Sequence, residues 1–364
     1  MQLQALKLHN FRSFSEREFK FFDRNLIYGK NGTGKTNILE ALHLVCTGKS
    51  FRANSNQDYI KDTKLPSSIF INWKDELKNI NHKQSLTLQA IDLKKIKKSF
   101  YRNSKKVGIS NFIGKFPVIV FAPEELRMIW GTPKDRRSII DLFIAQTKPT
   151  HAIKLLRYSQ IIRQRNKLLF VVGLGRADIH ELEFWDSELV SIGSDIIFNR
   201  NNIIKGLNKY IQAQYKDISG TKDRVELLLE GTVSAEIGNF KLGEIRDIYQ
   251  KKLQQNIRTD IKQGNTSIGP HRDDVNLSIN DNKISCLGSR GEGKTAVLAM
   301  KFSQKHFLKE QLNIKKCLFL LDDAFSELDK SRRQYLLENL GDEQSIFTST
   351  TIYPKTKKFN LIKL

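Results

Sequence analysis

The sequence predicts an α/β fold in which an α-helical second lobe is inserted into a lobe of mixed β-sheet and helices. Strand patterns, seen as alternating or continuous apolar runs, occupy residues 2–9, 17–28 and about 67–122. From about 135 to 262 the apolar residues follow helical spacing instead, and strand and Gly-rich patterns return after about 264. This order indicates that the chain leaves the first lobe and later comes back to it.

The lobe boundaries follow from these changes of pattern. We expect the N-terminal part of the first lobe at 1–134, the helical lobe at 135–264 and the C-terminal part of the first lobe at 265–364. Inside the first lobe, Asn103 and Ser104 separate two basic strand-like arms and predict a hairpin turn.

The helical lobe carries one apolar stripe, whose members step by three and four residues. They are Leu182, Trp185, Leu189, Ile192 and Ile196. Such a stripe is typical of the buried face of a helix in a compact lobe. The run is too short for the arms of an extended coiled coil.

The charge of the chain is strongly unbalanced. The 364 residues include 61 Lys and Arg against 39 Asp and Glu, a formal net charge of +22. Such a field attracts polyanions, and each phosphate neutralised by a cation releases condensed counterions. Charge spread over solvated faces would give the same composition, so net charge alone favours nucleic acid only modestly. No apolar run approaches the roughly 18–20 residues that cross a bilayer, and we expect no membrane partner.

The three cysteines, Cys46, Cys286 and Cys317, lie far apart and form no CxxC pair. This spacing argues against a zinc site or a disulfide framework. It is consistent with a reducing compartment, and we expect a cytoplasmic protein.

The strongest local motif is the G-x-x-x-x-G-K-[ST] segment from Gly29 to Thr36, which lies between a predicted strand and a predicted helix. Glycines allow consecutive backbone N–H groups to curl around phosphates, and the helix N-terminus adds partial positive charge. Lys35 has the reach for the β- and γ-phosphates of a nucleotide, and the Thr36 hydroxyl is a ligand for Mg²⁺. The segment therefore predicts ATP binding.

A second element supplies carboxylates. The apolar run Cys317–Leu321 predicts a strand buried on both faces, and it ends in Asp322 and Asp323. An N-capping role would explain one acid but not two. We expect Asp322 to bind Mg²⁺ and Asp323 to position or deprotonate the attacking water.

A second Gly-containing loop, Ser289 to Thr295, precedes another predicted helix. A Ser-x-Gly loop that opens a helix is a further phosphate-binding N-terminus. Because one nucleotide rarely needs two such loops in one chain, we expect Ser289 and Gly291 of one subunit to cap ATP held by the other. The order of the motifs thus predicts an ATP-dependent homodimer.

These motifs, in this order, resemble the ABC-type ATPase heads and within them the RecF family. The resemblance covers essentially the whole chain. It rests most specifically on FAPEEL at 121–126, GPHRDD at 269–274 and LLDDAFSELD at 320–329, with FTSTT at 347–351. It implies a P-loop ABC-type ATPase lobe with a helical second lobe, without the long coiled coil of related chromosome-maintenance heads.

The same resemblance implies a function. It implies ATP-dependent dimerisation on double-stranded DNA near single-strand gaps, slow DNA-stimulated hydrolysis, and cooperation with RecR and RecO in loading recombinase. The alternative is a nucleotide-gated DNA-binding module with little or no hydrolysis. A transporter motor is disfavoured, because Ser289 and Asp322 lie roughly 33 residues apart, a longer gap than resemblance to transporters implies.

The second loop departs from the family pattern S-x-G-Q-Q-[RK]-T, since Glu292 and Gly293 replace the two glutamines. A carboxylate near a γ-phosphate is unfavourable unless it is turned away. His271 and Arg272 in GPHRDD are assigned either to the nucleotide or to the lobe interface, and the sequence leaves both open.

We predict the following site. Asp323 and Lys35 are the catalytic residues, and Thr36 and Asp322 bind Mg²⁺. The nucleotide-binding residues are Gly29, Lys30, Asn31, Gly32, Thr33, Gly34, Lys35, Thr36 and Asn37, with Ser289 and Gly291 of the second copy. Candidate DNA contacts are the basic segment Lys94–Arg102 with Lys105 and Lys106, the pair Lys49 and Arg52, and the pair Arg163 and Arg165.

Overall fold

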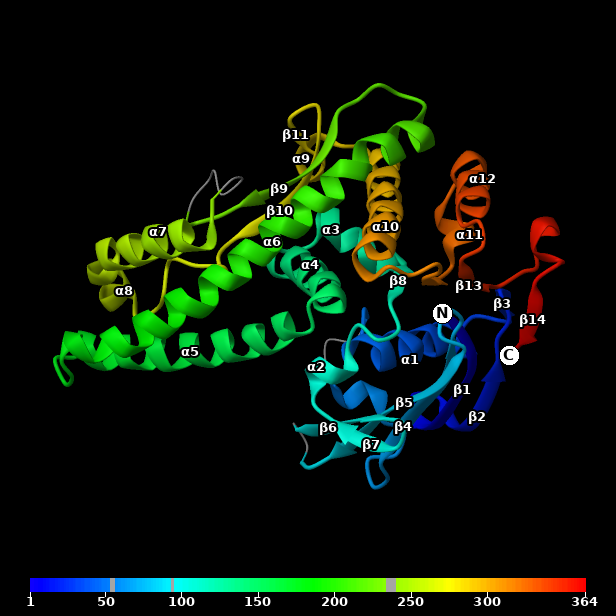
Figure 1. Ribbon diagram of the computed structural model, residues 1–364, viewed down its shortest axis with the longest axis horizontal. Helices are drawn as coiled ribbons and strands as arrows, with labels where there is room; N and C mark the ends of the chain where they lie inside the picture. Colours follow the sequence, from blue (N-terminus) through cyan, green and yellow to red (C-terminus); the bar gives the residue numbers. More distant parts are fainter. Residues whose placement is uncertain (53–55, 93–94, 234–239) are drawn as a thin grey trace. The chain divides into compact units, whose positions relative to one another are not determined.

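The computed structural model spans the whole chain (Figure 1) and describes residues 1–52, 56–92, 95–233 and 240–364. It separates into two compact units. The first comprises 1–126, 213–221 and 294–364, and the second comprises 127–212 and 222–293. The lobe boundaries given from the sequence stay a prediction.

A parallel five-stranded sheet forms one half of the first unit. Its order is β14(Asn360–Lys363), β3(Arg24–Tyr28), β13(Gln344–Ser349), β12(Leu318–Leu321) and β8(Val118–Phe121). Every pairing in it is parallel. All residues of β8, β12 and β13 are buried, which explains why β8 and β12 are continuous apolar runs.

An antiparallel six-stranded sheet forms the other half. Its order is β2(Phe14–Lys20), β1(Gln2–Phe11), β4(Ser67–Asp75), β5(Ile80–Ala90), β6(Ile96–Arg102) and β7(Lys105–Val107). Asn103 and Ser104 join β6 to β7 with φ of 48° and 65°. Positive φ at both central residues is the geometry of a tight two-residue hairpin. The predicted turn is confirmed.

Helix α1(Lys35–Thr47) lies between these two sheets. It contacts β1, β4 and β5 of the antiparallel sheet and β8, β12 and β13 of the parallel sheet. From Ile38 to Thr47 every side chain is buried, so α1 is apolar nearly all round. The remaining helical elements of this unit are η1(Asn56–Tyr59), α2(Ile109–Phe112), η2(Pro123–Leu126), α11(Ala324–Glu327), α12(Lys330–Asn339) and η5(Pro354–Thr356). Helix α10(Arg290–Leu312) begins in the second unit and continues into the first.

The second unit is mainly helical. Its helices are α3(Arg127–Trp130), α4(Pro133–Thr147), α5(Thr150–Gly173), η3(Ile179–Glu181), most of α6(Leu182–Ser219), α7(Leu242–Gln255), α8(Ile257–Gln263) and α9(Ile284–Leu287). It also contains a small antiparallel sheet of β11(Asn282–Lys283), β10(Asp274–Ile279) and β9(Val225–Glu230). Strand β9 lies inside the stretch expected to be helical. Its alternating burial is satisfied by pairing with β10, a partner far along the chain.

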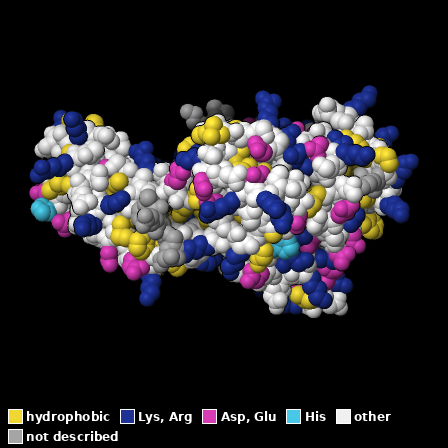
Figure 2. Space-filling model, turned by 90° about the horizontal axis from the view of Figure 1, so that it is seen from above, with side chains coloured by type: hydrophobic (Ala, Val, Ile, Leu, Met, Phe, Trp, Pro, Cys, Tyr) yellow, Lys and Arg dark blue, Asp and Glu magenta, His cyan; other side chains and the backbone are white. Residues whose placement is uncertain are grey.

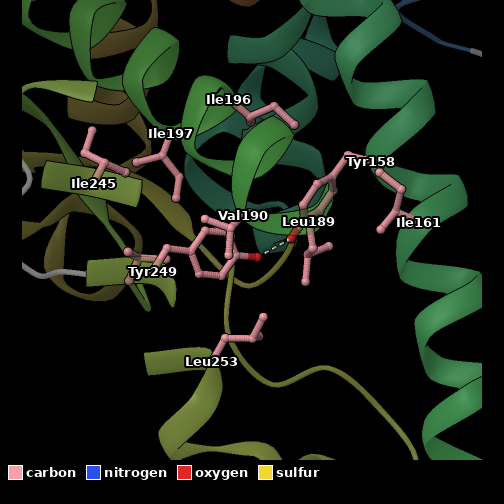
Figure 3. Close-up of a cluster of buried hydrophobic side chains, with 10 residues drawn as sticks. Tyr158, Ile161, Leu189, Val190, Ile196, Ile197, Ile245, Tyr249 and Leu253 are labelled. Atoms are coloured by element: carbon pink, nitrogen blue, oxygen red, sulfur yellow. Dashed lines mark hydrogen bonds between the residues drawn. The ribbon is translucent and has the colours of Figure 1, made fainter. Parts of the chain in front are cut away.

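The predicted apolar stripe forms part of the core of the second unit. Leu189 and Ile196 of α6 are fully buried with Tyr158 and Tyr249, and Trp185 and Ile192 pack against the same cluster. Figure 3 shows the tyrosine rings converging, and their hydroxyls lie 3.0 Å apart. The stripe is therefore the buried face of a helix, as predicted. Across the described ranges, no helix is long and apolar enough to cross a membrane.

Candidate nucleotide site

The candidate site lies at the carboxyl edge of the parallel sheet. Strand β3 leads into the loop Gly29–Gly34, and β12 leads into Asp322 and Asp323. Strand β13 lies between β3 and β12 and ends at Ser349. Because all these strands are parallel, their carboxyl ends meet at one edge, which is where open α/β sheets bind ligands.

The Gly29–Gly34 loop has the backbone geometry of a phosphate cradle. Gly32 and Gly34 have φ of 83° and 100°, in the left-handed region that favours glycine. A Cβ on Gly34 would lie 2.7 Å from the Ser13 hydroxyl oxygen. Gly34 is also the N-cap of α1, so the loop delivers its N–H groups at a helix N-terminus.

Lys35 and Thr36 begin α1. The Lys35 ammonium donates to the carbonyl oxygens of Gly29 and Lys30, each at 2.8 Å, and so holds the loop closed. Asn37 follows, and its amide donates to the Ser13 hydroxyl at 3.1 Å. Thr33 donates back to the Lys30 carbonyl at 3.0 Å, which fixes the outer side of the loop.

Asp322 is the centre of a hydrogen-bond network. The hydroxyls of Thr36 and Thr348 both donate to its Oδ1, at 3.0 and 2.6 Å. The backbone N–H of Asp323 donates to the Thr348 hydroxyl at 2.9 Å. Burial raises the pKa of Asp322 to about 6, and the two hydroxyl hydrogen bonds oppose that rise. The arrangement places a hydroxyl and a carboxylate side by side, which are hard oxygen ligands of the kind Mg²⁺ prefers.

Asp323 sits at a strained turn directly after this pair. Its φ of 46° and ψ of 27° place a non-glycine residue in the left-handed region, which usually costs free energy and is often found at functional sites. Burial raises the pKa of its carboxyl, whereas Lys35 lowers it. The carboxylate therefore lies within electrostatic reach of the P-loop lysine and is a candidate base.

Two neighbours of this network have no role in the sequence prediction. Thr348 joins Asp322 to Asp323, and Glu124 after β8 raises the pKa of Asp322 by like-charge repulsion. Glu124 Oε2 is buried and has no hydrogen-bond partner in the part of the chain that the structure describes. Both residues lie in motifs that carry the family resemblance, FTSTT and FAPEEL, and membership of these motifs is the feature of the sequence that could have identified them.

Ser289 to Gly293 of the second loop belong to the second unit. The Ser289 backbone N–H donates to Glu292 Oε2 at 2.7 Å, and the Glu292 N–H donates to the Ser289 hydroxyl at 3.2 Å. This is a reciprocal capping box, so the Glu292 carboxylate is directed at its own helix start. The glycine at position 293 is also explained by its surroundings, because a Cβ there would lie 2.5 Å from the Trp130 ring. Each of the two residues that depart from the family pattern, Glu292 and Gly293, is therefore accounted for by a contact in the structure.

A basic hollow of about 530 Å³ lies beside the start of α1. It is lined by Arg12, Ser13, Asn37, Arg52, Asp58, Ile60 and Lys61. The Arg12 guanidinium donates two hydrogen bonds of 2.9 Å to Glu40, a buried carboxylate of α1. This bidentate pair fixes Arg12 at the wall of the hollow.

The candidate DNA contacts divide by burial. Arg165 is fully buried and donates to Asp186 and Asp260 at 2.6 and 2.7 Å, so its assignment as a DNA contact is wrong. Lys98 donates to the Gly48 carbonyl, and burial lowers its pKa to about 8. Arg163 is exposed.

The exposed members of the basic hairpin are Lys95, Lys97, Lys105 and Lys106, while Lys94 lies outside the described residues. Figure 2 shows Lys and Arg side chains spread over the visible face with acidic ones between them. The visible basic side chains do not gather into one patch there.

His271 and Arg272 are held inside the second unit. His271 is bonded to the Tyr158 hydroxyl at 2.9 Å and to the Thr266 carbonyl at 3.0 Å, and burial lowers its pKa to about 4. Arg272 donates to the Thr266 carbonyl and to Asn265. The neutral ring and its partners give His271 a structural role in this unit.

Comparisons with known proteins give consistent matches. Residues 2–358 match the family model of the RecF/RecN/SMC N terminal domain. The chain is 32% identical to the DNA replication and repair protein RecF of Halothermothrix orenii, over 99% of this chain and 95% of the relative. It is 33% identical to the RecF of Clostridium perfringens, over 97% of this chain and 94% of that protein.

Solved structures agree with these relatives. The recombination mediator protein RecF with ATP, of the RecFOR pathway, superposes with a TM-score of 0.88 at 28% identity, covering 96% of this chain and 92% of that one. The Smc head domain of Pyrococcus furiosus superposes with a TM-score of 0.50 at 17% identity, over 96% of this chain and 90% of that one, and shows the fold alone.

Proposed function

The chain belongs to the RecF family of DNA replication and repair proteins, and we propose that it is an ATP-dependent DNA-binding protein of recombinational gap repair and replication-fork maintenance. The resemblance and the fold class predicted from the sequence, a P-loop ABC-type ATPase lobe with a helical second lobe, are confirmed. The hydrogen bond between Thr36 and Asp322 carries the proposal, because it joins the P-loop to the acidic strand in one network.

In this proposal the Gly29–Asn37 segment holds ATP. Lys35 exchanges its bonds to the loop carbonyls for the β- and γ-phosphates, and Thr36 and Asp322 hold Mg²⁺. When bound there, Mg²⁺ would neutralise the negative charge that develops on the transferred phosphoryl group. Asp323 orients the attacking water and accepts its proton.

The dimer is the second part of the proposal. Ser289 and Gly291 of one copy cap the nucleotide held by the P-loop of the other, and slow hydrolysis reopens the pair. The observation that supports this role is the capping box, which orders the start of α10 and turns the Glu292 carboxylate back. Sedimentation with ATP, using Asp323→Asn to block turnover, tests this step. A chain that stays monomeric with ATP and DNA contradicts it.

The DNA role rests on the net charge of +22 and on the exposed cations of the β6–β7 hairpin. We propose double-stranded DNA near single-strand gaps as the substrate, with RecR and RecO as partners in loading recombinase. Gel shifts with duplex, single-stranded and gapped DNA, with and without ATP and across salt concentrations, test the preference. A Lys35→Ala variant is the matched control, and its binding should lose the ATP dependence. Equal binding of wild type with and without ATP would overturn the proposal.

Hydrolysis separates this function from a nucleotide-gated module with little turnover. We propose a weak, DNA-stimulated ATPase. Asp323 lies within electrostatic reach of Lys35, and burial raises the pKa of its carboxyl, which makes the carboxylate a better proton acceptor. Phosphate release by the wild type that disappears in Asp323→Asn supports the enzyme. We also propose a cytoplasmic location, since Cys46, Cys286 and Cys317 are all free thiols.

A further inference from the structure

A polar pocket of about 320 Å³, distant in sequence from the P-loop, lies within the first unit. We call it the Trp73 pocket. Trp73 of β4, His82 of β5 and Arg102 of β6 contribute to its lining. Its volume is at the lower end of the range for small-ligand sites, so it fits one chemical group and its immediate neighbours.

The strand register explains why these three side chains meet. Trp73 lies directly opposite His82, and Gln84, two residues further along β5, lies opposite Arg102. Residues opposite each other, and residues two apart, share a face of the sheet. The Trp73 and His82 rings stack with centroids 4.2 Å apart, which fixes both of them.

Each of the three carries a buried nitrogen without a hydrogen-bond partner within the described ranges: Trp73 Nε1, His82 Nδ1 and Arg102 Nε. Trp73 itself is only 2% exposed. Buried polar atoms are rarely left unpaired, so these three residues of the lining call for an acceptor beside them. Indole and guanidinium nitrogens can only donate, so the ligand must be an acceptor.

The charges around the pocket favour an anionic acceptor. Lys78, Lys115 and Arg102 line it together with one acid, Asp75. Asp75 Oδ1 already accepts the backbone N–H groups of Leu77 and Lys78, at 3.1 and 3.3 Å. Burial and the positive charge of Arg102 lower the pKa of His82, so the ring is neutral near pH 7 and still offers one N–H.

The walls indicate how the anion is presented. Ile80, Leu312 and Ile314 add apolar surface to the lining, which also includes Met1 and Gly114. The donors are buried, so the anion must be carried on a slender side chain that reaches inward. A phosphodiester in a duplex is fixed along a broad backbone and cannot enter in this way. An aspartate or glutamate flanked by apolar residues fits both features.

We propose that the Trp73 pocket binds a carboxylate side chain of a partner polypeptide, whose oxygens accept hydrogen bonds from Trp73 Nε1 and Arg102 Nε. Planar carboxylates suit the fixed donors of a guanidinium, and burial makes such charge-assisted bonds strong. The site is separate from the nucleotide network, so it does not depend on the function proposed above.

The test follows the indole N–H signal of Trp73 by NMR in the full chain, assigned by its loss in Trp73→Phe. The probe is the peptide acetyl-Ser-Leu-Glu-Leu-Ser-amide, and its control has Gln in place of Glu. A saturable downfield shift of the Trp73 signal is expected with the Glu peptide. At least tenfold weaker binding is expected with the Gln peptide.

Variants locate the binding. Arg102→Gln should weaken the Glu peptide at least tenfold, and Lys115→Gln should weaken it by about threefold through charge alone. Lys83 is an exposed neighbour of His82 on the same strand, and Lys83→Gln should leave the affinity for the Glu peptide unchanged. Thermal unfolding and ATP binding check that each variant is folded. If Arg102→Gln does not fold, the effect of Lys115→Gln on the affinity for the Glu peptide tests the proposal. Equal affinity for the two peptides, or tighter binding of inorganic phosphate than of the Glu peptide, overturns the proposal.

Discussion

Ser289 and Glu292 cap each other across the first turn of α10. The Glu292 carboxylate accepts the Ser289 N–H at 2.7 Å, and the Ser289 hydroxyl accepts the Glu292 N–H at 3.2 Å. Glutamine, which the family pattern has here, also forms capping boxes. The substitution therefore keeps the local structure and adds one negative charge to the loop proposed to face the partner's nucleotide.

Glu292→Gln should strengthen the ATP-dependent dimer without changing the fold. Removing one charge near the phosphates should tighten dimerisation by roughly two- to tenfold, an effect that high salt reduces. Sedimentation across a concentration series with ATP measures it. Glu292→Ala is the control, since it removes the same charge but also the cap, and should cost about 1 kcal/mol of stability. An unchanged dimer constant in Glu292→Gln would show that this loop does not face the nucleotide.

Gly293→Ala should destabilise the second unit. The added Cβ would lie 2.5 Å from the far end of the Trp130 ring, which is 43% exposed and must shift, and we expect a cost of about 1 kcal/mol. Urea unfolding measures the loss, and Trp130→Leu in the same chain should recover part of it. Gly243→Ala in α7, where a Cβ meets nothing within 4 Å, should be neutral or stabilising. Equal effects at the two glycines would contradict the packing argument.

Thr348→Val should slow ATP turnover at least tenfold while changing ATP binding less than threefold. The variant removes the hydroxyl that donates to the Asp322 carboxylate and accepts from the backbone N–H of Asp323, so the carboxylate of Asp322 and the backbone that carries Asp323 lose a positioning contact. Steady-state phosphate release and nucleotide titration separate the two effects. Thr351→Val makes the same change at an exposed position of the same motif and should behave as wild type. Turnover at the wild-type rate in Thr348→Val would exclude a positioning role.

The contribution of His271 and His43 to the free energy of unfolding should fall as the pH is lowered from about 6.5 to about 4. Burial lowers the pKa of His271 to about 4 and that of His43 to about 3, from the ordinary value of 6.5. Between these values each of these two rings binds more protons in the unfolded chain than in the folded one, so its contribution to stability rises with pH and is lost on acidification. Asp322 and Asp273, whose pKa values burial raises to about 6, contribute with the opposite sign between about pH 4 and 6. The loss from His271 is at most about 3 kcal/mol.

Urea unfolding at a series of pH values measures this slope. His271→Gln should make the slope less positive, although the variant also loses the ring's hydrogen bonds and starts less stable. His180→Gln should not flatten it, because that ring is exposed and Glu183 raises its pKa. A slope that persists unchanged in His271→Gln would assign the acid sensitivity to other groups.

The sequence by itself determined the elements whose chemistry is local. A phosphate cradle is made by consecutive N–H groups, so Gly29 to Thr36 can be recognised without knowing what surrounds it. The turn at Asn103 and Ser104 and the buried strand before Asp322 are similarly encoded within a few residues. The family pattern added the order of the motifs, and with it the fold.

The tertiary structure decided everything that depends on distant neighbours. Thr348 reaches Asp322 only because β13 lies between β3 and β12, and strand order is not written in any local pattern. Two neighbouring basic residues, Arg163 and Arg165, look equivalent in the sequence, but one faces solvent and the other pairs with Asp186 and Asp260.

The start of α10 at Ser289 depends both on a local sequence pattern and on tertiary contacts. Its Ser-x-Gly pattern was visible in the sequence, whereas the direction of the Glu292 carboxylate and the ring against Gly293 were not. Side-chain direction follows from hydrogen bonds and packing that form only in the folded chain. Residue type therefore fixed which chemistry this protein carries, and strand order and burial fixed which of those groups meet.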